Sequence, residues 1–378
     1  MKIGLVTTLG TNIGDDFIRE GLCGLFRACL PDREIEFVCI NKHKPYSAYP
    51  VWHPVRIAAH TKNLPQAKYW SRERIFRSAG MWGGSLVDDS DLIVQCGTPV
   101  AWPSCHDSEW AEPLWKHTLG RLSRQGIPVI NIGAGSCYPW ERQPLCIQDT
   151  ADSRYLKEIL SYCQITTVRD RLLKDLFLKL GHDCPFIPCP ALLAGQLFSA
   201  PVDESADTFV INYMEGAGHY AWGQKIDSGL WRSTVQNIMQ KMKNKHPIMF
   251  LCHDEKEFRS AQELAPEVPR VLPRSPGEYF EVLKKARFGL CNRLHASMAF
   301  AGLGIPSIAV GTDTRLLMVE AIGLPSLYVN DATEDCLESI IVRLSERVTM
   351  ERGRLLALRD EVWGNYTKLL KPVLAPLA

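Results

Sequence analysis

The sequence predicts an α/β protein made of two Rossmann-like domains with parallel sheets, and three observations carry this prediction. Short apolar runs rich in β-branched residues alternate with amphipathic stretches along the chain, as in parallel sheets covered by helices on both faces. The 378 residues suit two domains at roughly 150 residues each. A polar, proline-containing segment over 198–207 separates one strand-and-helix series from the next.

The short apolar runs are the predicted strands, and they lie at Ile3–Thr8, Ile35–Ile40, Leu92–Cys96, Val129–Ile132, Ile165–Val168, Phe209–Tyr213, Ile248–Cys252, Phe288–Cys291 and Ser307–Val310. The amphipathic stretches between them predict helices over Phe17–Leu30, Ser153–Tyr162, Arg171–Leu180, Trp231–Lys243 and Gly277–Lys285. A last long helix is expected over Thr349–Leu370 and should end at Pro372, because proline cannot continue the hydrogen-bond ladder.

These elements predict an N-terminal domain over 1–197 and a C-terminal domain over 207–345. A closing helical segment over 346–378 is expected to pack back across both domains. Ligands bind at the carboxyl ends of the strands in open parallel sheets. We therefore expect a ligand cleft between the two domains.

Composition excludes several classes of protein. Lys and Arg number 43 against 42 Asp and Glu, so no nucleic-acid partner held by bulk charge is expected. No apolar run approaches the roughly 18 residues of a membrane span, and no secretory signal precedes the first strand. The 13 cysteines are an odd number without zinc-ligand spacing, which favours a reducing compartment and no metal site. We expect a cytoplasmic protein.

The most informative motif follows the predicted strand Phe288–Cys291. A helix begins directly after it and Asn292, and Arg293 and His295 lie in its first turn. Small residues follow in this helix from Ala296 onwards. Unpaired N–H groups in the first turn of a helix favour an anion, and Arg and His add a fork and a titratable group. The motif therefore predicts an anion site with catalytic capacity. The alternative is an ordinary buried turn with a satisfied His and a surface Arg.

A second Arg is placed in the same way in the N-terminal domain. Arg169 follows the strand Ile165–Val168 and is a candidate anion ligand, although an ion pair with Asp170 or Asp175 is an equal alternative. Nearby, Gly133 lies in a small-residue stretch after the strand Val129–Ile132, where we expect exposed backbone amides.

The first strand leads into a turn with Asn12, Gly14 and Asp15. Its spacing is not that of the G-x-G-x-x-G dinucleotide fingerprint, and the acidic residues would repel a pyrophosphate. The turn therefore favours a neutral, hydroxyl-rich ligand. The alternative is that Asp15 only caps the helix Phe17–Leu30.

Aromatic residues gather in two loops. His219, Tyr220 and Trp222 follow the strand Phe209–Tyr213 and suit stacking on a sugar, although interdomain packing would use the same residues. The Trp-rich stretch Trp102–Trp115 is expected to be core or interface. The sequence contains no Walker loop, no H-E-x-x-H helix and no Ser–His–Asp order that would indicate a hydrolase or an NTPase.

Taken together, these motifs resemble the polysaccharide pyruvyl transferases. The resemblance is carried by Asn292-Arg-Leu-His-Ala-Ser-Met-Ala-Phe-Ala-Gly-Leu-Gly-Ile-Pro306, Asn12-Ile-Gly-Asp15, Val168-Arg-Asp170 with Leu180-Gly181, and Ser275-Pro-Gly-Glu-Tyr-Phe280. It implies a GT-B-like fold and transfer of a pyruvyl unit from phosphoenolpyruvate to a sugar or glycan, including a lipid-linked one. The product is usually a cyclic ketal, formed without a metal or other cofactor.

The resemblance also implies site residues. Arg293 and His295 match the donor-site pair, with Asn292, Ala296 and Gly133 beside it, and Arg169 matches a second anion-binding Arg. His295 would act as acid, base or phosphate ligand. Asn12, Gly14 and Asp15 would face the acceptor, together with the aromatic loop His219, Tyr220 and Trp222.

Two positions depart from the pattern of the family. Gly97-Thr98-Pro99 stands where members usually have three glycines, and Cys189 stands where an Asp often precedes Pro-Ala. Two other functions therefore remain open. The chain could be a GT-B glycosyltransferase that uses a nucleotide sugar, or a relative that binds a glycan or partner without turnover.

Overall fold

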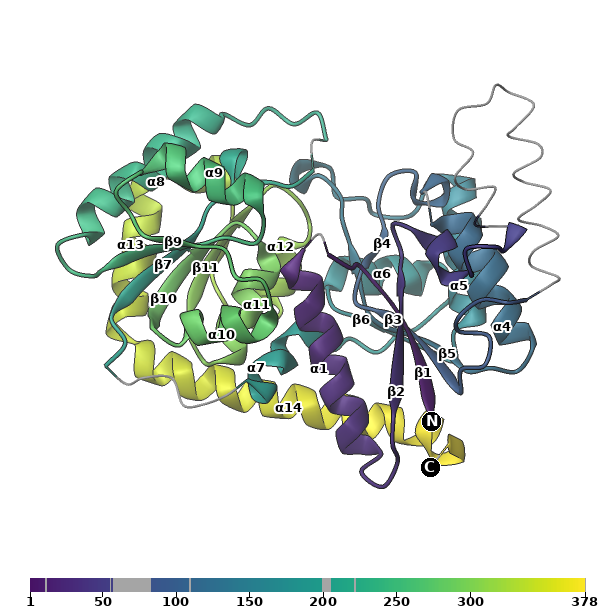
Figure 1. Ribbon diagram of the computed structural model, residues 1–378. Helices are drawn as coiled ribbons and strands as arrows, with labels where there is room; N and C mark the ends of the chain where they lie inside the picture. Colours follow the sequence, from purple (N-terminus) through teal and green to yellow (C-terminus); the bar gives the residue numbers. More distant parts are fainter. Residues whose placement is uncertain are drawn as a thin grey trace.

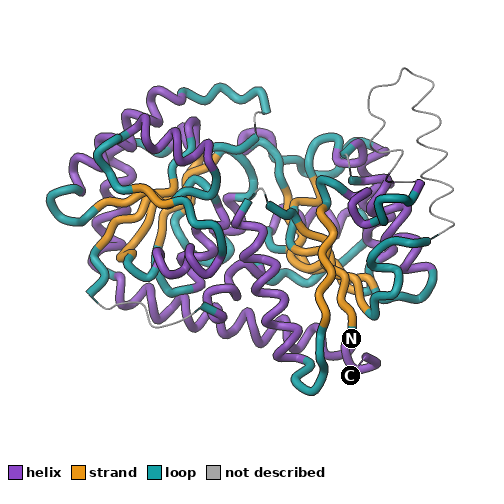
Figure 2. Tube along the Cα trace, viewed as in Figure 1, coloured by secondary structure: helices purple, strands orange, loops and turns teal. Residues whose placement is uncertain are grey.

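The structure is a computed structural model that describes residues 1–10, 12–54, 56, 83–108, 110–198, 205–220 and 222–377. Two six-stranded parallel sheets form two lobes, and helices cover the faces of each sheet (Figures 1 and 2). The predicted α/β class with two parallel-sheet domains is confirmed. Of the predicted linker 198–207, residues 199–204 lie outside the described residues.

The first sheet has the strand order β2-β1-β3-β5-β4, with β6 also pairing with β5. Its strands are β1 (Lys2–Thr7), β2 (Glu36–Asn41), β3 (Leu92–Cys96), β4 (Pro99–Ala101), β5 (Val129–Ser136) and β6 (Ile165–Val168). The second sheet has the order β12-β11-β10-β7-β8-β9. Its strands are β7 (Thr208–Asn212), β8 (Ile248–Leu251), β9 (Arg270–Val271), β10 (Ala286–Cys291), β11 (Ser307–Gly311) and β12 (Ser326–Tyr328).

The helices of the first lobe are α1 (Ile13–Cys29), α4 (Gly120–Arg124), α5 (Thr150–Tyr162), α6 (Arg171–Lys179) and α7 (Ala194–Leu197). A π-helical segment, Ala111–Leu119, leads into α4. The helices that follow are α8 (Ser228–Met242), α9 (Glu255–Leu264), α10 (Pro276–Leu283), α11 (Leu294–Gly302), α12 (Leu316–Glu320), α13 (Glu334–Glu346) and α14 (Val348–Leu374). None of the described helices has both the length and the apolarity that a membrane crossing requires.

Every predicted strand is present, and three short strands were not predicted. β4, β9 and β12 have two or three residues each, too few to show a period in the sequence. β5 is longer than predicted, because it continues through Gly133 to Ser136. The expectation of exposed amides there is wrong: the N–H of Gly133 donates to Oγ1 of Thr167 at 2.7 Å, inside the sheet.

Several helix ends also differ from the prediction by a few residues, and those of α1 and α14 have a clear physical reason. α1 begins at Ile13 and not at Phe17, since the side chain of Asn12 is the N-cap and accepts from the N–H of Gly14 at 3.0 Å. Pro372 does not end α14 but lies inside its last turn. The proline removes only one hydrogen bond there, while the buried Leu374 beyond it still packs against the core.

α1 and α14 join the two lobes. In Figure 1, α1 runs between the lobes and α14 crosses beneath both. Phe17 of α1 packs against Tyr279 and Phe280 of α10, with ring centroids 4.8 and 5.3 Å apart. Tyr366 of α14 donates from its hydroxyl to the carbonyl of Pro188 in the first lobe at 2.9 Å. One apolar core therefore continues from one domain into the other.

The carboxyl edges of the two sheets are also bonded to each other. The N–H of Trp140 donates to the carbonyl of Thr312 at 3.1 Å, and the N–H of Thr314 donates to the carbonyl of Tyr138 at 2.9 Å. These contacts hold the loops after β5 and β11 side by side. These hydrogen bonds therefore close one side of the cleft that was predicted between the domains.

Candidate active site

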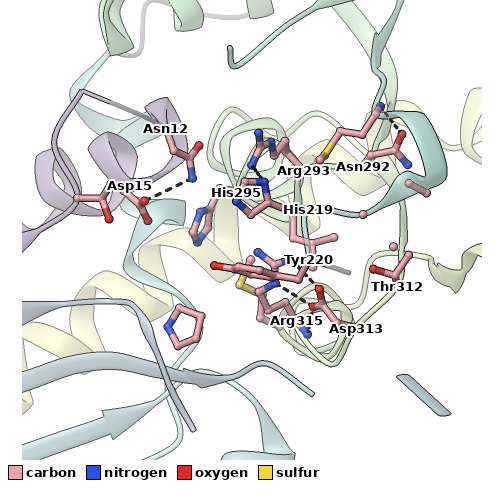
Figure 3. A pocket seen from close by; sticks show the side chains of 18 of the residues that line it. Asn12, Asp15, His219, Tyr220, Asn292, Arg293, His295, Thr312, Asp313 and Arg315 are labelled. Carbon is pink, nitrogen blue, oxygen red and sulfur yellow. Dashed lines mark hydrogen bonds and ion pairs between the residues drawn. The ribbon is translucent and has the colours of Figure 1, made fainter. Parts of the chain in front are cut away.

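A pocket with a volume of about 220 Å³ lies between the domains, where the carboxyl ends of both sheets meet (Figure 3). The first domain lines it with Thr8, Asn12, Asp15, Lys42, His43, Pro99 and Arg169. The second domain lines it with Met214, Ala217, Gly218, His219, Tyr220, Asn292, Arg293, Leu294, His295, Gly311, Thr312, Asp313, Arg315 and Met318. We call this the anion pocket, because four of these residues are Lys or Arg and two are Asp.

Arg293 is held by two carboxylates. Its Nε donates to Glu257 and its Nη2 to Asp254, both on or beside α9, and its side chain is 9% exposed. Burial raises the pKa of Glu257, and Arg293 partly offsets this rise. The backbone N–H of Arg293 donates to the side chain of Asn212 at 2.7 Å. The charge of Arg293 is therefore already balanced by the protein.

Arg169 is bound in a different way. Its guanidinium is buried, and Nη1 donates to the carbonyl of Gly97 at 3.0 Å and approaches Sγ of Cys189 at 3.5 Å. Among the described residues no carboxylate forms an ion pair with it, and its Nη2 has no hydrogen-bond partner. Gly135 provides the space, since a Cβ there would lie 2.5 Å from Nε of Arg169. The alternative of an ion pair with Asp170 or Asp175 is wrong.

The carboxylate of Asp170 is used elsewhere. It caps α6 by accepting from the N–H of Leu173 at 2.8 Å, and it accepts from the N–H and hydroxyl of Ser136. These bonds fix the end of β6 and with it the backbone that carries Arg169. A buried cation without a balancing carboxylate is costly unless a ligand supplies the negative charge.

Two further cations line the anion pocket, and the sequence reasoning missed both. Arg315 forms a bidentate pair with Asp313, at 2.8 Å from Nε and 2.7 Å from Nη2, and its guanidinium lies 4.8 Å from the ring centroid of Tyr220. Lys42 is buried, donates to Oγ1 of Thr98, and has no ion pair within the part of the chain that is described. Burial lowers the pKa of Lys42, and Arg169 and Arg315 lower it further.

A signal for both residues was present in the sequence. Lys42 comes directly after the strand Glu36–Asn41, and Arg315 follows β11 by a short turn. The rule that ligands bind at the carboxyl ends of parallel strands applies to them as it does to Arg169 and Arg293. Neither residue lies in a distinctive motif, and for that reason neither was predicted.

His295 lies at the centre of these charges. Nη1 of Arg169 donates to its Nε2 at 3.2 Å, so the ring in this state is neutral with its proton on Nδ1. Burial lowers the pKa of His295 well below its ordinary value, and the charges of Arg169 and Arg315 add to the effect. Gly14 allows this position, because a Cβ at residue 14 would lie 2.7 Å from Cβ of His295.

His219 connects the charged groups of the second domain. Nη1 of Arg293 donates to its Nδ1 at 3.1 Å, which leaves Nε2 as the protonated nitrogen. Burial lowers the pKa of His219 to about 4, and Arg293 and Arg315 contribute to this shift. The ring is therefore a neutral hydrogen-bond donor at neutral pH.

The structure thus brings together eight of the residues predicted for the site: Asn12, Asp15, Arg169, His219, Tyr220, Asn292, Arg293 and His295. Asn292 lines the pocket, and its side chain accepts from the N–H of Met214 and donates to the carbonyl of Val310, which fixes its orientation. Asp15 accepts from the side-chain amide of Asn12 at 3.4 Å.

Four predicted residues do not line the anion pocket. Gly133 lies within β5, and Ala296 is completely buried in α11. Gly14 has no side chain, and this leaves room for His295 beside it. Trp222 lines a second pocket next to the first. Gly133, Gly14 and Ala296 do not line the pocket because a position near a strand end does not reveal which way the residue faces. The acceptor contact predicted for Trp222 stays a prediction.

One group of described side chains has the composition of a metal site: His106, Asp149 and Asp152. Their oxygen atoms already accept protein hydrogen bonds. Asp149 caps α5, and Asp152 accepts from the backbone N–H groups of Ser104 and His106 at 3.0 Å and from Nδ1 of His106 at 2.6 Å. The bonds of Asp152 attach the loop with Ser104 and His106 to α5, and this accounts for the cluster.

Comparison with solved structures shows similar folds. The chain is similar to UDP-GlcNAc 2-epimerase from Neisseria meningitidis bound to UDP-GlcNAc, with 13% identity, TM-score 0.55 and 100% of both chains covered. It is also similar to S. aureus MnaA in complex with UDP, with 10% identity, TM-score 0.55 and coverage of 98% of this chain and 96% of that one.

A third similar structure is UDP-GlcNAc 2-epimerase from Methanocaldococcus jannaschii in complex with UDP-GlcNAc and UDP. Here the identity is 12%, the TM-score 0.51, and the coverage 91% of this chain and 93% of that one. At these identities the likeness concerns the fold, which is the expected GT-B-like pair of domains. Comparison with curated proteins found no match.

The family is shown by the sequence itself. The family model for polysaccharide pyruvyl transferase matches residues 12–314, which include both Arg-bearing strand ends and the whole anion pocket except Thr8, Arg315 and Met318. This span covers well over half of the chain. The protein is therefore a transferase that belongs to the polysaccharide pyruvyl transferase family.

Proposed function

We propose that this chain transfers a pyruvyl unit from phosphoenolpyruvate to hydroxyl groups of a sugar or glycan intermediate and releases phosphate. One observation supports this most: Arg169 and Lys42 lie buried in the anion pocket without an ion-pair partner among the described residues, next to Arg315. Phosphoenolpyruvate carries a phosphate ester and a carboxylate on the same carbon, C2. Its negative charge would balance the positive charge of these side chains.

The reaction has a simple balance of bonds and protons. One acceptor oxygen adds to C2 of the enol while C3 takes up a proton and becomes a methyl group. The bond between C2 and the phosphate oxygen then breaks as a second acceptor oxygen adds to C2. The product is a cyclic ketal with inorganic phosphate, and the two hydroxyl protons end on C3 and on phosphate.

The cations would hold the donor and stabilise the departing phosphate. Arg169 offers a planar fork that suits either anionic group. Lys42 adds a point charge from the end of β2. Arg315 keeps its charge in this buried place. Burial opposes that charge, but the ion pair and hydrogen bonds with Asp313, together with other neighbouring groups, raise the pKa of the guanidinium well above its ordinary value.

His295 is the candidate acid. In the structure its Nε2 accepts from Arg169, so it cannot deliver a proton from that atom. A bound anion would compete for Arg169 and offset the cations that lower the pKa of His295. The ring would then gain a proton on Nε2 beside the donor. Proton transfer by a positioned group is worth about 10²–10⁴-fold in rate.

Arg293 takes a different part in this proposal. The prediction that it binds the donor directly remains a prediction, and its two carboxylate partners favour a positioning role. It orients His219 and fixes the first turn of α11, which carries His295. Asn12 and Asp15 face the same pocket from α1 and would contact the acceptor.

The test is phosphate release from phosphoenolpyruvate across a panel of sugar acceptors, with Lys42→Met and Lys44→Met as a matched pair. Lys44 is exposed and lies two residues from Lys42. We expect Lys42→Met to raise KM for phosphoenolpyruvate by about 10–100-fold, the range for one hydrogen bond to a charged group. Lys44→Met should behave as wild type. Turnover of a UDP-hexose without phosphoenolpyruvate would contradict the proposal and favour the glycosyltransferase.

A further inference from the structure

A second pocket, of about 270 Å³, adjoins the anion pocket and has a different chemistry. Its walls include the indoles of Trp102, Trp110 and Trp222, and it shares Lys42, Pro99 and Tyr220 with the anion pocket. None of the residues that line it is acidic, and Lys42 is its one charged residue, within the described part of the chain. We call it the aromatic pocket.

The aromatic rings come from both domains. Trp102 and Trp110 belong to the loop after β4, and their ring centroids are 5.5 Å apart at an angle of 57°. Tyr220 and Trp222 belong to the loop after β7, with centroids 5.7 Å apart at 44°. The pocket therefore exists only because the two domains meet.

The loop of the second domain is fixed in place across the interface. Nη2 of Arg142 donates to the carbonyl of Trp222 at 2.5 Å, and the side-chain amide of Gln224 donates to the carboxylate of Glu141. These bonds hold the loop between the two pockets. Such a fixed arrangement is what a preformed ligand site requires.

The aromatic rings are not simply packed as core. Tyr220 is 43% exposed, and Trp102, Trp110 and Trp222 are all partly exposed, whereas the neighbouring Trp115 is 2% exposed and belongs to the core. The sequence prediction of core or interface for this Trp-rich stretch is confirmed: Trp115 belongs to the core, and Trp102 and Trp110 pack against that core and line the pocket between the domains.

Polar groups among the rings indicate what kind of molecule fits. The indole N–H of Trp222 is buried and has no hydrogen-bond partner. Oγ1 of Thr98 accepts from Lys42, so its own proton is available for donation. An alkyl chain would give the Thr98 hydroxyl and the Lys42 ammonium no hydrogen-bond partner, which is unfavourable for buried donors. A ring with C–H faces and hydroxyl groups satisfies both the indoles and the polar groups.

We propose that the aromatic pocket is the acceptor subsite and binds one neutral hexopyranosyl ring by stacking on these indoles, with its hydroxyls directed to Lys42 at the border of the anion pocket. This inference rests on the proposed function. The volume is just below the range of about 300–1,000 Å³ for drug-sized ligands, which suits a single ring. Lys42 lies in both pockets and its Nζ is 5.2 Å from the ring centroid of Trp110, so the acceptor would meet the donor there.

The experiment measures binding of the acceptor and of the donor separately. Methyl gluco-, galacto- and mannopyranosides are titrated into the protein and followed by saturation-transfer NMR, and phosphoenolpyruvate is titrated by calorimetry. The variants are Trp102→Ala and Trp222→Phe, with Trp52→Ala as control, because Trp52 is 70% exposed and lines neither pocket. Circular dichroism and the thermal midpoint show that each variant is folded.

We expect at least one neutral hexopyranoside to bind. Trp102→Ala should weaken this binding by about tenfold through lost stacking, and Trp222→Phe by about fivefold through the smaller ring. The Kd of phosphoenolpyruvate should change by no more than about twofold in both variants, since neither Trp102 nor Trp222 lines the anion pocket. Trp52→Ala should leave both ligands unaffected.

Three results would overturn the subsite: no neutral hexopyranoside binds with or without phosphoenolpyruvate, binding is the same in both Trp variants, or an octyl chain without a sugar binds equally well. Failure of the proposed function gives a different result. In that case wild-type protein would not bind phosphoenolpyruvate, while the sugar would still bind in a manner that depends on Trp102 and Trp222.

Discussion

Arg169 and Arg293 have the same place in the two halves of the molecule but opposite electrostatic environments. Each follows the carboxyl end of a parallel strand, β6 or β10, directly before a helix. Arg293 is bound by Asp254 and Glu257, while Arg169 contacts only neutral groups and keeps an unpartnered Nη2. The comparison teaches that an Arg at a strand end marks the site but does not show whether its charge is free for a ligand.

The largest effect should come from removing Arg293 with a side chain of similar length. Arg293→Met leaves Glu257 buried, with 3% of its side chain exposed, and without its cation. We expect the free energy of unfolding to fall by about 3–5 kcal/mol, as for a broken buried ion pair. Urea unfolding measures this change. The double variant Arg293→Met/Glu257→Leu should recover most of the loss, and no recovery would mean that the pair is not the cause.

The same substitution at Arg169 should act on the ligand and not on the fold. Arg169→Met is expected to lower kcat/KM for phosphoenolpyruvate by about 10²–10³-fold, the range for one lost electrostatic contact to a reacting group. The free energy of unfolding should stay the same or rise, because a buried unpaired cation is removed. Steady-state kinetics and urea unfolding test both parts. The exposed Arg171→Met is the control, and a large loss of stability in Arg169→Met would contradict the comparison.

A smaller effect is expected from pH. The pKa of His295 lies below its ordinary value because of burial and of the charges on Arg169 and Arg315. An anion bound next to them raises this pKa, so binding takes up a proton and strengthens as pH falls. For one proton, affinity changes by at most about tenfold per pH unit. Sulfate is the suitable probe, since it does not titrate near neutrality.

Calorimetry of sulfate binding between about pH 6 and 8, in buffers of different ionisation enthalpy, measures this uptake directly. His295→Gln should abolish it, while His219→Gln should retain it. Uptake that persists in His295→Gln would assign the coupling to Lys42, whose pKa is also lowered by burial and by the same two arginines. Binding that does not depend on pH would remove the proposed role of His295 as an acid gated by the donor.

The smallest effect should come from the outer partner of Arg293. Asp254 is 29% exposed, so its ion pair is screened by solvent, and Asn can still cap α9 at this position. We expect Asp254→Asn to lower the free energy of unfolding by less than about 1 kcal/mol. Glu257→Gln should cost more, because Glu257 is the buried partner. Equal losses in urea unfolding would show that both carboxylates share the charge of Arg293.

Several features of the site followed from strand ends alone. The apolar runs placed Arg169 and Arg293 at carboxyl ends, and parallel pairing brings such ends to one edge of a sheet. Asn12, Asp15, His219 and His295 were identified by the same reasoning. It should also have included Lys42 and Arg315, which follow β2 and β11 but lack a distinctive motif.

The direction in which each residue faces within the site did not follow from the sequence. Gly133 and Ala296 were predicted as donor contacts, yet they are buried in β5 and α11, because a bulge or a helical turn decides which side of the backbone meets the cleft. Trp102 and Trp110 were expected in the core or an interface. They pack against the core of the first domain as expected, but the sequence did not show that they also line a pocket with Tyr220 and Trp222 of the second domain.

The sequence by itself determined the fold class, the two sheets, the long last helix and the family, because these depend on local periodicity and on collinear motifs. Only the tertiary structure decided which charges are balanced. Asp254 and Glu257 are 39 and 36 residues away from Arg293 along the chain, yet they bind its guanidinium. The partners of a buried charge are set by contacts between distant segments, and among the described residues those contacts give Arg169 and Lys42 no ion-pair partner.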